Sequence, residues 1–292
     1  MQGICKLCND ETILKESHFI PKFIGKWVKK TGVTGYLREK NKVHKRAQDL
    51  AKEYWLCGNC ETLFSGWERS FANKVFYPFV EQGKSTANYD SWMAKFCASL
   101  SWRTLTFIRS KNSDEIKSRE YNNCLESAQK HWAHFVLNKE KNLNQFEQHV
   151  YPLDAIQSTN IGHLPENINR YFMRTMAMDI VGNSTDIYTY TKLPQFIIMG
   201  VIKAKGTGVM RSSRIALNSG KIYPREYRMP DGFDKYIIES ASKVTEAYNQ
   251  IPEKHRDGFD DYIIRNPEKA ANSKLIEAFL HDYRQFGDEV FR

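Results

Sequence analysis

The chain has 292 residues and a mass of 34.1 kDa, enough for one large domain or two ordinary ones with a sizeable core. With 41% hydrophobic and 26% charged residues, and no stretch approaching the ~20 apolar residues that cross a bilayer, its composition excludes a disordered or membrane-spanning chain. The net charge of +9 favours polyanionic partners, nucleic acid first among them. The opening MQGICKLCND lacks a secretion or organelle signal, so we expect a cytoplasmic protein with no membrane partner.

Four of the six cysteines form two C-x-x-C pairs, Cys5 with Cys8 and Cys57 with Cys60. Each pair has the spacing of a zinc knuckle, and together they supply four thiolates for one tetrahedral structural zinc. In a reducing compartment this pattern favours a metal site over disulfides. We therefore predict a zinc-bound module over residues 1–80, with little regular structure before its second cysteine pair.

Basic residues concentrate between the two cysteine pairs. Residues 22–46 contain nine basic residues and a single acid, Glu39. Such a charge run attracts nucleic acid through counterion release, whereas a solvated face is the alternative interpretation. The predicted nucleic-acid contacts are Lys22, Lys26, Lys29, Lys30, Lys45 and Arg46, and the remaining basic residues of this run are Arg38, Lys40 and Lys42.

Helical periodicity dominates the next part of the chain. Residues 65–79 place apolar side chains at helical spacing, and the pattern returns over 91–109 and 114–138. A shorter helix is predicted over 167–180. We assign residues 90–180 to a helical region.

The pattern then changes to that of strands. IYTYTK alternates, PQFIIMGVIKA is a nearly continuous apolar run, and VMRSSRIAL and KIYPREYR suggest two more short strands. The turn-like KGTG and NSG between them predict an antiparallel meander of three or four strands. Helical periodicity resumes at Asp231, where DGFDKYII is followed later by DGFDDYII, and we read both as helix starts with an Asp cap. Residues 181–292 thus form a predicted third region.

The segment ESHFIP lies between the cysteine pairs, and the second pair opens a helical pattern. Over residues 4–76 this arrangement resembles the HNH endonuclease family, whose ββα-metal fold is related to the treble clef. The resemblance implies a hairpin that carries His18 and a helix that starts near Cys60. It also implies a catalytic divalent cation between hairpin and helix, separate from the structural zinc.

Phosphodiester hydrolysis needs a base that activates water and a hard cation that stabilises the phosphate. By resemblance His18 is the general base. Three departures from the family pattern stand out: Ser17 stands where an acidic residue is common, Glu61 replaces a histidine, and no obvious asparagine precedes the second pair, where RAQDL offers Gln48 and Asp49 and Asn59 lies between the cysteines. The candidates that remain for holding Mg²⁺ or Mn²⁺ are Glu61 with Asp49 or Glu16.

Two explanations of Glu61 stay open. Its carboxylate suits a hard cation, so an active one-metal nuclease is one possibility. The other is a lost active site in which Glu61 simply favours the positive end of its helix. Glu68, further down the same helix, is another candidate ligand, with a surface position as the alternative. Bacterial and phage proteins with an SH-x-IP segment, a QD dipeptide and a C-x-x-C-E helix resemble this chain, which would make the glutamate a family trait.

The sequence thus predicts an α+β protein: an N-terminal treble-clef zinc module followed by helices and a small antiparallel meander. Its expected role is that of an HNH-like DNA endonuclease, or a degenerate DNA-binding relative, in a phage or defence context. The rival is a non-catalytic protein-binding module, such as a phage-encoded inhibitor that encloses a host defence nuclease complex. A homo-oligomer is compatible with both.

Overall fold

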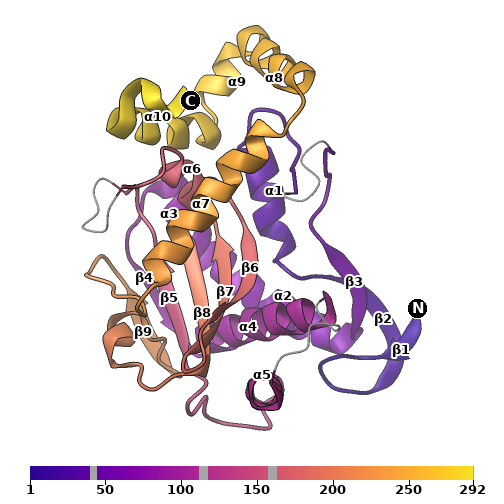
Figure 1. Cartoon of the computed structure of the whole chain (residues 1–292). Coiled ribbons are helices and arrows are strands. Elements are labelled where there is room, and N and C mark those ends of the chain that lie inside the picture. The colour runs from indigo at the N-terminus through magenta and orange to yellow at the C-terminus, as the bar shows by residue number, and fades with distance from the viewer. Residues whose placement is uncertain (40–44, 112–117, 157–162, 292) are drawn as a thin grey trace.

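The structure is a computed structural model that describes residues 1–39, 45–111, 118–156 and 163–291. Its described residues form three antiparallel sheets together with helices, which pack on both faces of the central four-stranded sheet, and this confirms the α+β class (Figure 1). None of the described helices combines the length and the apolar character that crossing a membrane requires.

The N-terminal part is more regular than its sequence suggested. Its sheet has the order β1-β2-β3, and a helix, α1, lies in the connection between β2 and β3. The prediction of little regular structure before Cys57 is therefore wrong, because TILKESH and KEYWLC pair as neighbouring strands. The elements are β1 (Gln2–Ile4), β2 (Glu11–His18), α1 (Lys22–Lys30), β3 (Lys52–Cys57) and α2 (Gly58–Phe71).

The helix that follows the second cysteine pair changes its winding partway along. After α2 the chain forms a π-helical segment, η2 (Ala72–Phe76), and then α3 (Tyr77–Gln82). Gly83 ends α3 with φ +64°, a left-handed conformation that suits glycine. The predicted helix start near Ser65 comes earlier, at Gly58, where Cys57 caps the helix.

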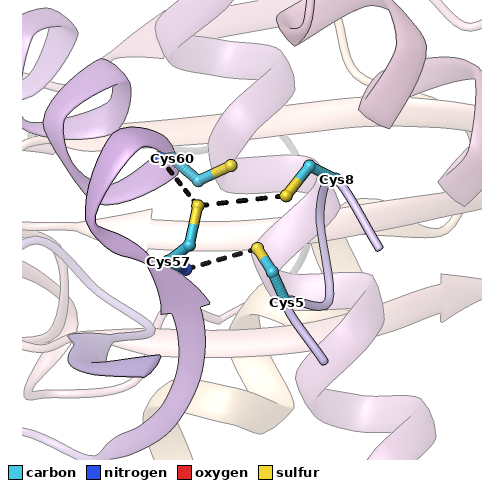
Figure 2. Close-up of side chains that lie close together, drawn as sticks. All are labelled: Cys5, Cys8, Cys57 and Cys60. Carbon is cyan, nitrogen blue, oxygen red and sulfur yellow. Dashed lines mark hydrogen bonds between the residues drawn. The ribbon is translucent and has the colours of Figure 1, made fainter. Parts of the chain in front are cut away.

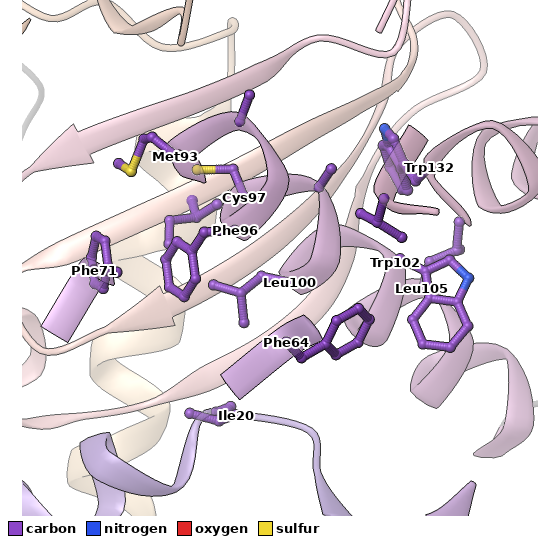
Figure 3. Close-up of a cluster of buried hydrophobic side chains, with 14 of the residues drawn as sticks. Ile20, Phe64, Phe71, Met93, Phe96, Cys97, Leu100, Trp102, Leu105 and Trp132 are labelled. Atoms are coloured by element: carbon purple, nitrogen blue, oxygen red, sulfur yellow. The ribbon is translucent and has the colours of Figure 1, made fainter. Parts of the chain in front are cut away.

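The centre of the molecule is α4 (Trp92–Lys111), of whose 20 residues 13 are buried. It packs on a four-stranded sheet of order β5-β8-β7-β6 and beside α5 (Arg119–Val136), as Figures 1 and 3 show. Gly200 allows a close approach, since a Cβ there would lie 2.7 Å from the Trp132 ring. Residues 114–117 of the predicted second helix lie outside the described residues; the described part of this helix begins after Ser118, which caps it.

The sheet is buried on both faces by helices. Along β8 (Phe196–Lys203) alternate side chains point to opposite faces: Ile198 joins the cluster around α4, while Met199 packs with Phe233 and Ile237 of α7 (Phe233–Asn249). A strand covered on both sides explains the continuous apolar run in its sequence. The strands are β5 (Gln148–Pro152), β6 (Ala177–Gly182), β7 (Ile187–Leu193) and β8 (Phe196–Lys203).

Two predictions for this region need correction. The helix expected over 167–180 is only α6 (Ile168–Arg174), and the chain then becomes strand β6, because the edge of β7 is available for pairing. The predicted strand VMRSS is a 3-10 helix, η3 (Gly208–Ser213). The last strand, β9 (Ser219–Ile222), does not extend the meander but pairs with β4 (Ala87–Asp90) in a separate sheet.

Helices complete the chain: α7 (Phe233–Asn249), α8 (Glu253–Arg265), α9 (Pro267–Ala271), α10 (Lys274–Phe286) and the 3-10 segment η4 (Gly287–Phe291). Asp282 of α10 is fully buried and accepts hydrogen bonds from the backbone of Asn169 and Arg170, which fastens α10 to α6. By contrast, α8 has no buried residue.

One buried cluster runs from Cys5 of the cysteine module through Phe64 and Trp102 to Phe196 of the sheet. The N-terminal module therefore shares its core with the body of the protein. The division at residues 80–90 and 180–181 stays a prediction.

Candidate metal centre and basic face

Four cysteine side chains meet at one end of the N-terminal sheet (Figure 2). Cys5 and Cys8 flank the turn between β1 and β2, while Cys57 ends β3 and Cys60 lies in the first turn of α2. All four Sγ atoms lie within 4.8 Å of one another, and only Cys8 is partly exposed. The convergence of the two C-x-x-C pairs is the one predicted from the cysteine spacing, whereas the hairpin and the helix were implied by the HNH resemblance.

The chemistry of the cluster suits a soft cation. Burial raises the pKa of Cys8 to about 12 and also raises that of Cys60. The pKa of Cys5 is lowered instead: burial alone would raise it, but backbone hydrogen bonds to the sulfur outweigh burial. One of these bonds comes from the Cys57 N–H, which lies 3.3 Å from the Cys5 Sγ. A bound metal ion deprotonates coordinating thiols outright, and four convergent thiolates are a typical zinc ligand set. The cluster can hold a metal ion and is compatible with zinc.

The predicted general base lies at the end of β2 in a small charged network. His18 Nε2 lies 3.0 Å from Asp49 Oδ1, and the His18 side chain is 10% exposed. Lys52 bridges Asp49 and Glu16, with Nζ–O distances of 3.4 and 2.8 Å. Partial burial raises the pKa of Asp49, but hydrogen bonds from His18 and the Leu50 N–H outweigh it, so this pKa lies below its usual value. Three of the four predicted catalytic residues are thus neighbours.

Glu61 lies apart from this network, on the helix side of the hairpin. The buried Ser17 hydroxyl donates to Glu61 Oε2 at 2.6 Å. These two residues are the departures from the HNH pattern that the sequence revealed. The pairing of β2 with β3 shifts at a bulge between Lys15 and Glu16. After this bulge, the Ser17 side chain faces α2. Ser17 and Glu61 are therefore in direct contact.

Glu68 is not on the surface, as the alternative interpretation had it. Arg103 Nη1, from α4, donates to Glu68 Oε1 at 2.7 Å and to the His18 carbonyl at 3.2 Å. Burial raises the pKa of Glu68, although the charge and hydrogen bond of Arg103 act in the opposite direction. Arg103 is 2% exposed and links β2, α2 and α4 through one guanidinium group. This pair occupies Glu68, so it is not an open ligand.

A second cation would need three or more convergent ligands. Within the described residues, the four cysteines are the only group of three or more Cys, His, Asp or Glu ligand atoms that lie within 4.8 Å of one another. Ser17 offers a hydroxyl where the HNH resemblance places a carboxylate. This hydroxyl donates a hydrogen bond to the Glu61 carboxylate, which was the first candidate for holding the cation. These residues do not fit a Mg²⁺ or Mn²⁺ site in this arrangement. Their catalytic roles stay a prediction.

The predicted basic contacts gather on and near α1. Lys22, Lys26 and Lys30 are exposed, and no Asp or Glu oxygen of the described residues lies within 4.0 Å of their Nζ atoms. Lys29 instead donates to the Gln48 carbonyl. The remaining predicted contacts, Lys45 and Arg46, are also exposed, whereas Lys40 and Lys42 lie outside the described residues.

The basic helix is anchored by side chains from other elements. Trp27 on its inner face packs edge-on against Phe76, with ring centroids 5.3 Å apart. Arg174 lies over the Trp27 ring and donates to the Val28 carbonyl and to Thr31 Oγ1, at 2.7 and 2.8 Å. Burial lowers the pKa of Arg174 to about 10. The lysines are therefore presented from a fixed element.

No protein-family model, curated protein or solved structure matches this chain. The resemblance to HNH endonucleases therefore stays a prediction based on its motifs. Sequence reasoning missed Arg103 and Lys52, which position the polar residues. The signal for Arg103 was present, since a single arginine inside the apolar stretch SWRTLTF indicates a buried ion pair.

Proposed function

We propose that this protein binds nucleic acid through the basic face of α1, that zinc occupies the four-cysteine cluster, and that the HNH-like centre serves as a scaffold without cation-dependent cleavage. The observation that carries the proposal is the set of three exposed lysines, Lys22, Lys26 and Lys30, on one helix, with no acidic oxygen of the described residues within 4.0 Å of their ammonium groups. Fixed cations of this kind bind phosphates by releasing condensed counterions.

The zinc site supports this role indirectly. It joins the strand β3 and helix α2 to the start of the chain, and α1 lies within the loop that the site closes. Structural zinc contributes to folding free energy outright. Zinc would therefore keep the basic helix in place without contacting the ligand.

The polar centre supports a scaffold more than a catalyst. The Ser17–Glu61 hydrogen bond ties the hairpin to α2, and the Glu68–Arg103 pair ties α2 to α4. The Glu61 carboxylate accepts a hydrogen bond from Ser17, and the Glu68 carboxylate is paired with the Arg103 guanidinium group. The interactions stabilise the contact between strand and helix on which the module depends.

The proposal is tested by measuring the binding of duplex DNA as a function of salt concentration. We expect the triple variant Lys22→Ala, Lys26→Ala, Lys30→Ala to reduce the slope of log K against log[salt] by about 2 to 3, since each phosphate contact contributes about 0.9. The matched control replaces three lysines of the C-terminal helices, Lys235, Lys243 and Lys254, and should leave the slope unchanged. Equal slopes for both variants would refute the proposal.

A cleavage assay tests the scaffold role. Plasmid and single-stranded DNA are incubated with the zinc-loaded protein and Mg²⁺ or Mn²⁺, and wild type is compared with His18→Ala. We expect no metal-dependent cutting. Cutting that disappears in His18→Ala would instead establish the nuclease and make Glu61 a working ligand.

A second candidate function is protein binding through the C-terminal helices. Ile264 and Phe291 are 74% and 69% exposed. A contiguous patch of exposed apolar side chains is typical of an interface, and the partly exposed rings of Tyr283 and Phe291 lie together, with centroids 6.0 Å apart. A pull-down from host lysate, with and without nuclease treatment, separates the two functions: partners held by nucleic acid are lost after treatment, whereas a bound protein is retained.

A further inference from the structure

A hollow of about 510 Å³ lies beside the basic helix. Lys26 and Lys30, one turn apart on α1, form one wall. The opposite wall comes from η2 and α3 and carries the side chains of Asn73, Tyr77 and Gln82. The hollow thus lies between the exposed lysines and the segment where the helix changes its winding.

The charge of the hollow favours an anion. Its one carboxylate belongs to Glu81, which accepts a hydrogen bond from Trp27 Nε1 at 3.1 Å. The two lysines have no ion-pair partner among the described residues, as noted above. Lys74, which follows Asn73 in the chain, lies 3.5 Å from Asp90 and is paired. The net charge of the lining is therefore positive.

The opposite wall carries a ring and two amides. Tyr77 is half-buried, and its ring packs edge-on against Phe76 and Phe23, with centroids 5.5 and 6.1 Å apart. Asn73 and Gln82 are exposed, and within the described residues their side-chain amides make no hydrogen bond. Asn73 lies in the π-helical segment, a feature that is frequent at functional sites. The Tyr77 ring can stack on a base, and the neighbouring amides of Asn73 and Gln82 can form hydrogen bonds with the edge of that base.

We propose that this hollow binds one or two nucleotides of a single-stranded nucleic acid. Lys26 and Lys30 contact the phosphates, Tyr77 stacks on a base, and Asn73 and Gln82 bond to the base edge. A single strand is favoured over a duplex because only unpaired bases can turn out to stack on a side chain. The inference rests on the proposed nucleic-acid function and specifies the form of the ligand.

The test measures fluorescence anisotropy of a labelled 12-nucleotide DNA strand, of the corresponding duplex, and of a 12-residue polyglutamate peptide. The full-length, zinc-loaded protein is used. We expect the single strand to bind more tightly than the duplex or the peptide. Lys26→Ala with Lys30→Ala should lower the single-strand salt slope by about 1.4, at about 0.7 for each phosphate. The control Lys243→Ala with Lys254→Ala should not change it.

Two further variants probe the opposite wall. Tyr77→Ala should weaken single-strand binding by about 5- to 150-fold, the range found for loss of one base stack, while Tyr77→Phe keeps the ring and should bind like wild type. Gln82→Glu changes one exposed amide to a carboxylate, does not disturb the core, and should also weaken binding. It therefore tests the hollow even if Tyr77→Ala fails to fold.

The outcomes separate this inference from the proposed function. Binding of the duplex as tight as that of the single strand, with Gln82→Glu unaffected, would refute the hollow and leave the basic face of α1 in place. Tighter binding of polyglutamate would assign the hollow to an acidic peptide and overturn the inference. Absence of binding to either nucleic acid at low salt would refute both proposals.

Discussion

Removal of one cysteine ligand should destabilise the whole molecule and not only its first 80 residues. The Cys8 and Cys57 sulfur atoms lie 3.9 Å apart and are 49 positions apart in the chain. A cross-link that closes a loop of roughly 50 residues is worth about 4 kcal/mol in the chain-entropy treatment. At about 2.1 cal/mol/K of unfolding entropy per residue, each kcal/mol corresponds to about 1.6 °C for 292 residues, so we expect the melting temperature to fall by about 6–7 °C.

The assay is differential scanning calorimetry of wild type and Cys60→Ser, each with and without a zinc chelator, after elemental analysis. We expect one zinc ion per wild-type chain and a large chelator effect that is absent from the variant. Cys124→Ser is the matched control, because Cys124 is partly exposed and lies outside the cluster. A zinc-free wild type, or equal melting temperatures with and without chelator, would refute the reasoning.

Three other predictions follow from the packing and charges described above. Arg103→Ala leaves Glu68 unpaired and should cost about 3–5 kcal/mol in the free energy of unfolding, measured by chemical denaturation, whereas Arg69→Ala at an exposed position of α2 should cost far less. Gly200→Ala would place a methyl group 2.5 Å from Ser101 Oγ and should lower the free energy of unfolding by about 1–3 kcal/mol. Gly206→Ala is its control, because a Cβ there would have no atom within 4 Å. An equal effect of both variants would contradict the packing argument. Because the pKa of Asp49 is lower in the folded chain, its contribution to stability is present above about pH 4 and is lost as the pH falls through its folded value. Asp49→Asn should therefore make the acid unfolding curve less steep below about pH 4, and an unchanged curve would count against the His18–Asp49 bond.

The features of the N-terminal module that were predictable are those set by short spacings. The two C-x-x-C pairs indicated one metal cluster, and the four thiols do converge. The contact between Ser17 and Glu61 was not predictable, although both residues stood out as departures. It depends on strand register, which the bulge after Lys15 shifts by one position, and a shift of one residue moves a side chain to the other face.

Other failures arose where one sequence suits two structures. Residues 175–180 continue a helical apolar pattern, yet pairing with β7 makes residues 177–182 a strand. The octapeptide DGFDKYII opens α7, but the cap is Gly232 in a left-handed conformation and not an aspartate. Its near-copy DGFDDYII lies inside α8, which has already begun at Glu253. The local sequence pattern predicts that a helix is present better than it predicts where the helix begins or ends, because tertiary contacts set those ends.

The position of α4 has a consequence for how the protein is made in a cell. Thirteen of its 20 residues become buried in the folded protein, and the sheet that covers it is complete only when Lys203 has left the ribosome. At ordinary translation speeds, the interval between the end of α4 and the end of β8 lasts roughly 5–20 s. Throughout that time the apolar side chains of α4 lack the sheet that buries them in the folded protein. An added chaperone that binds exposed apolar segments should therefore raise the soluble yield, whereas slower synthesis would prolong the exposure of this helix.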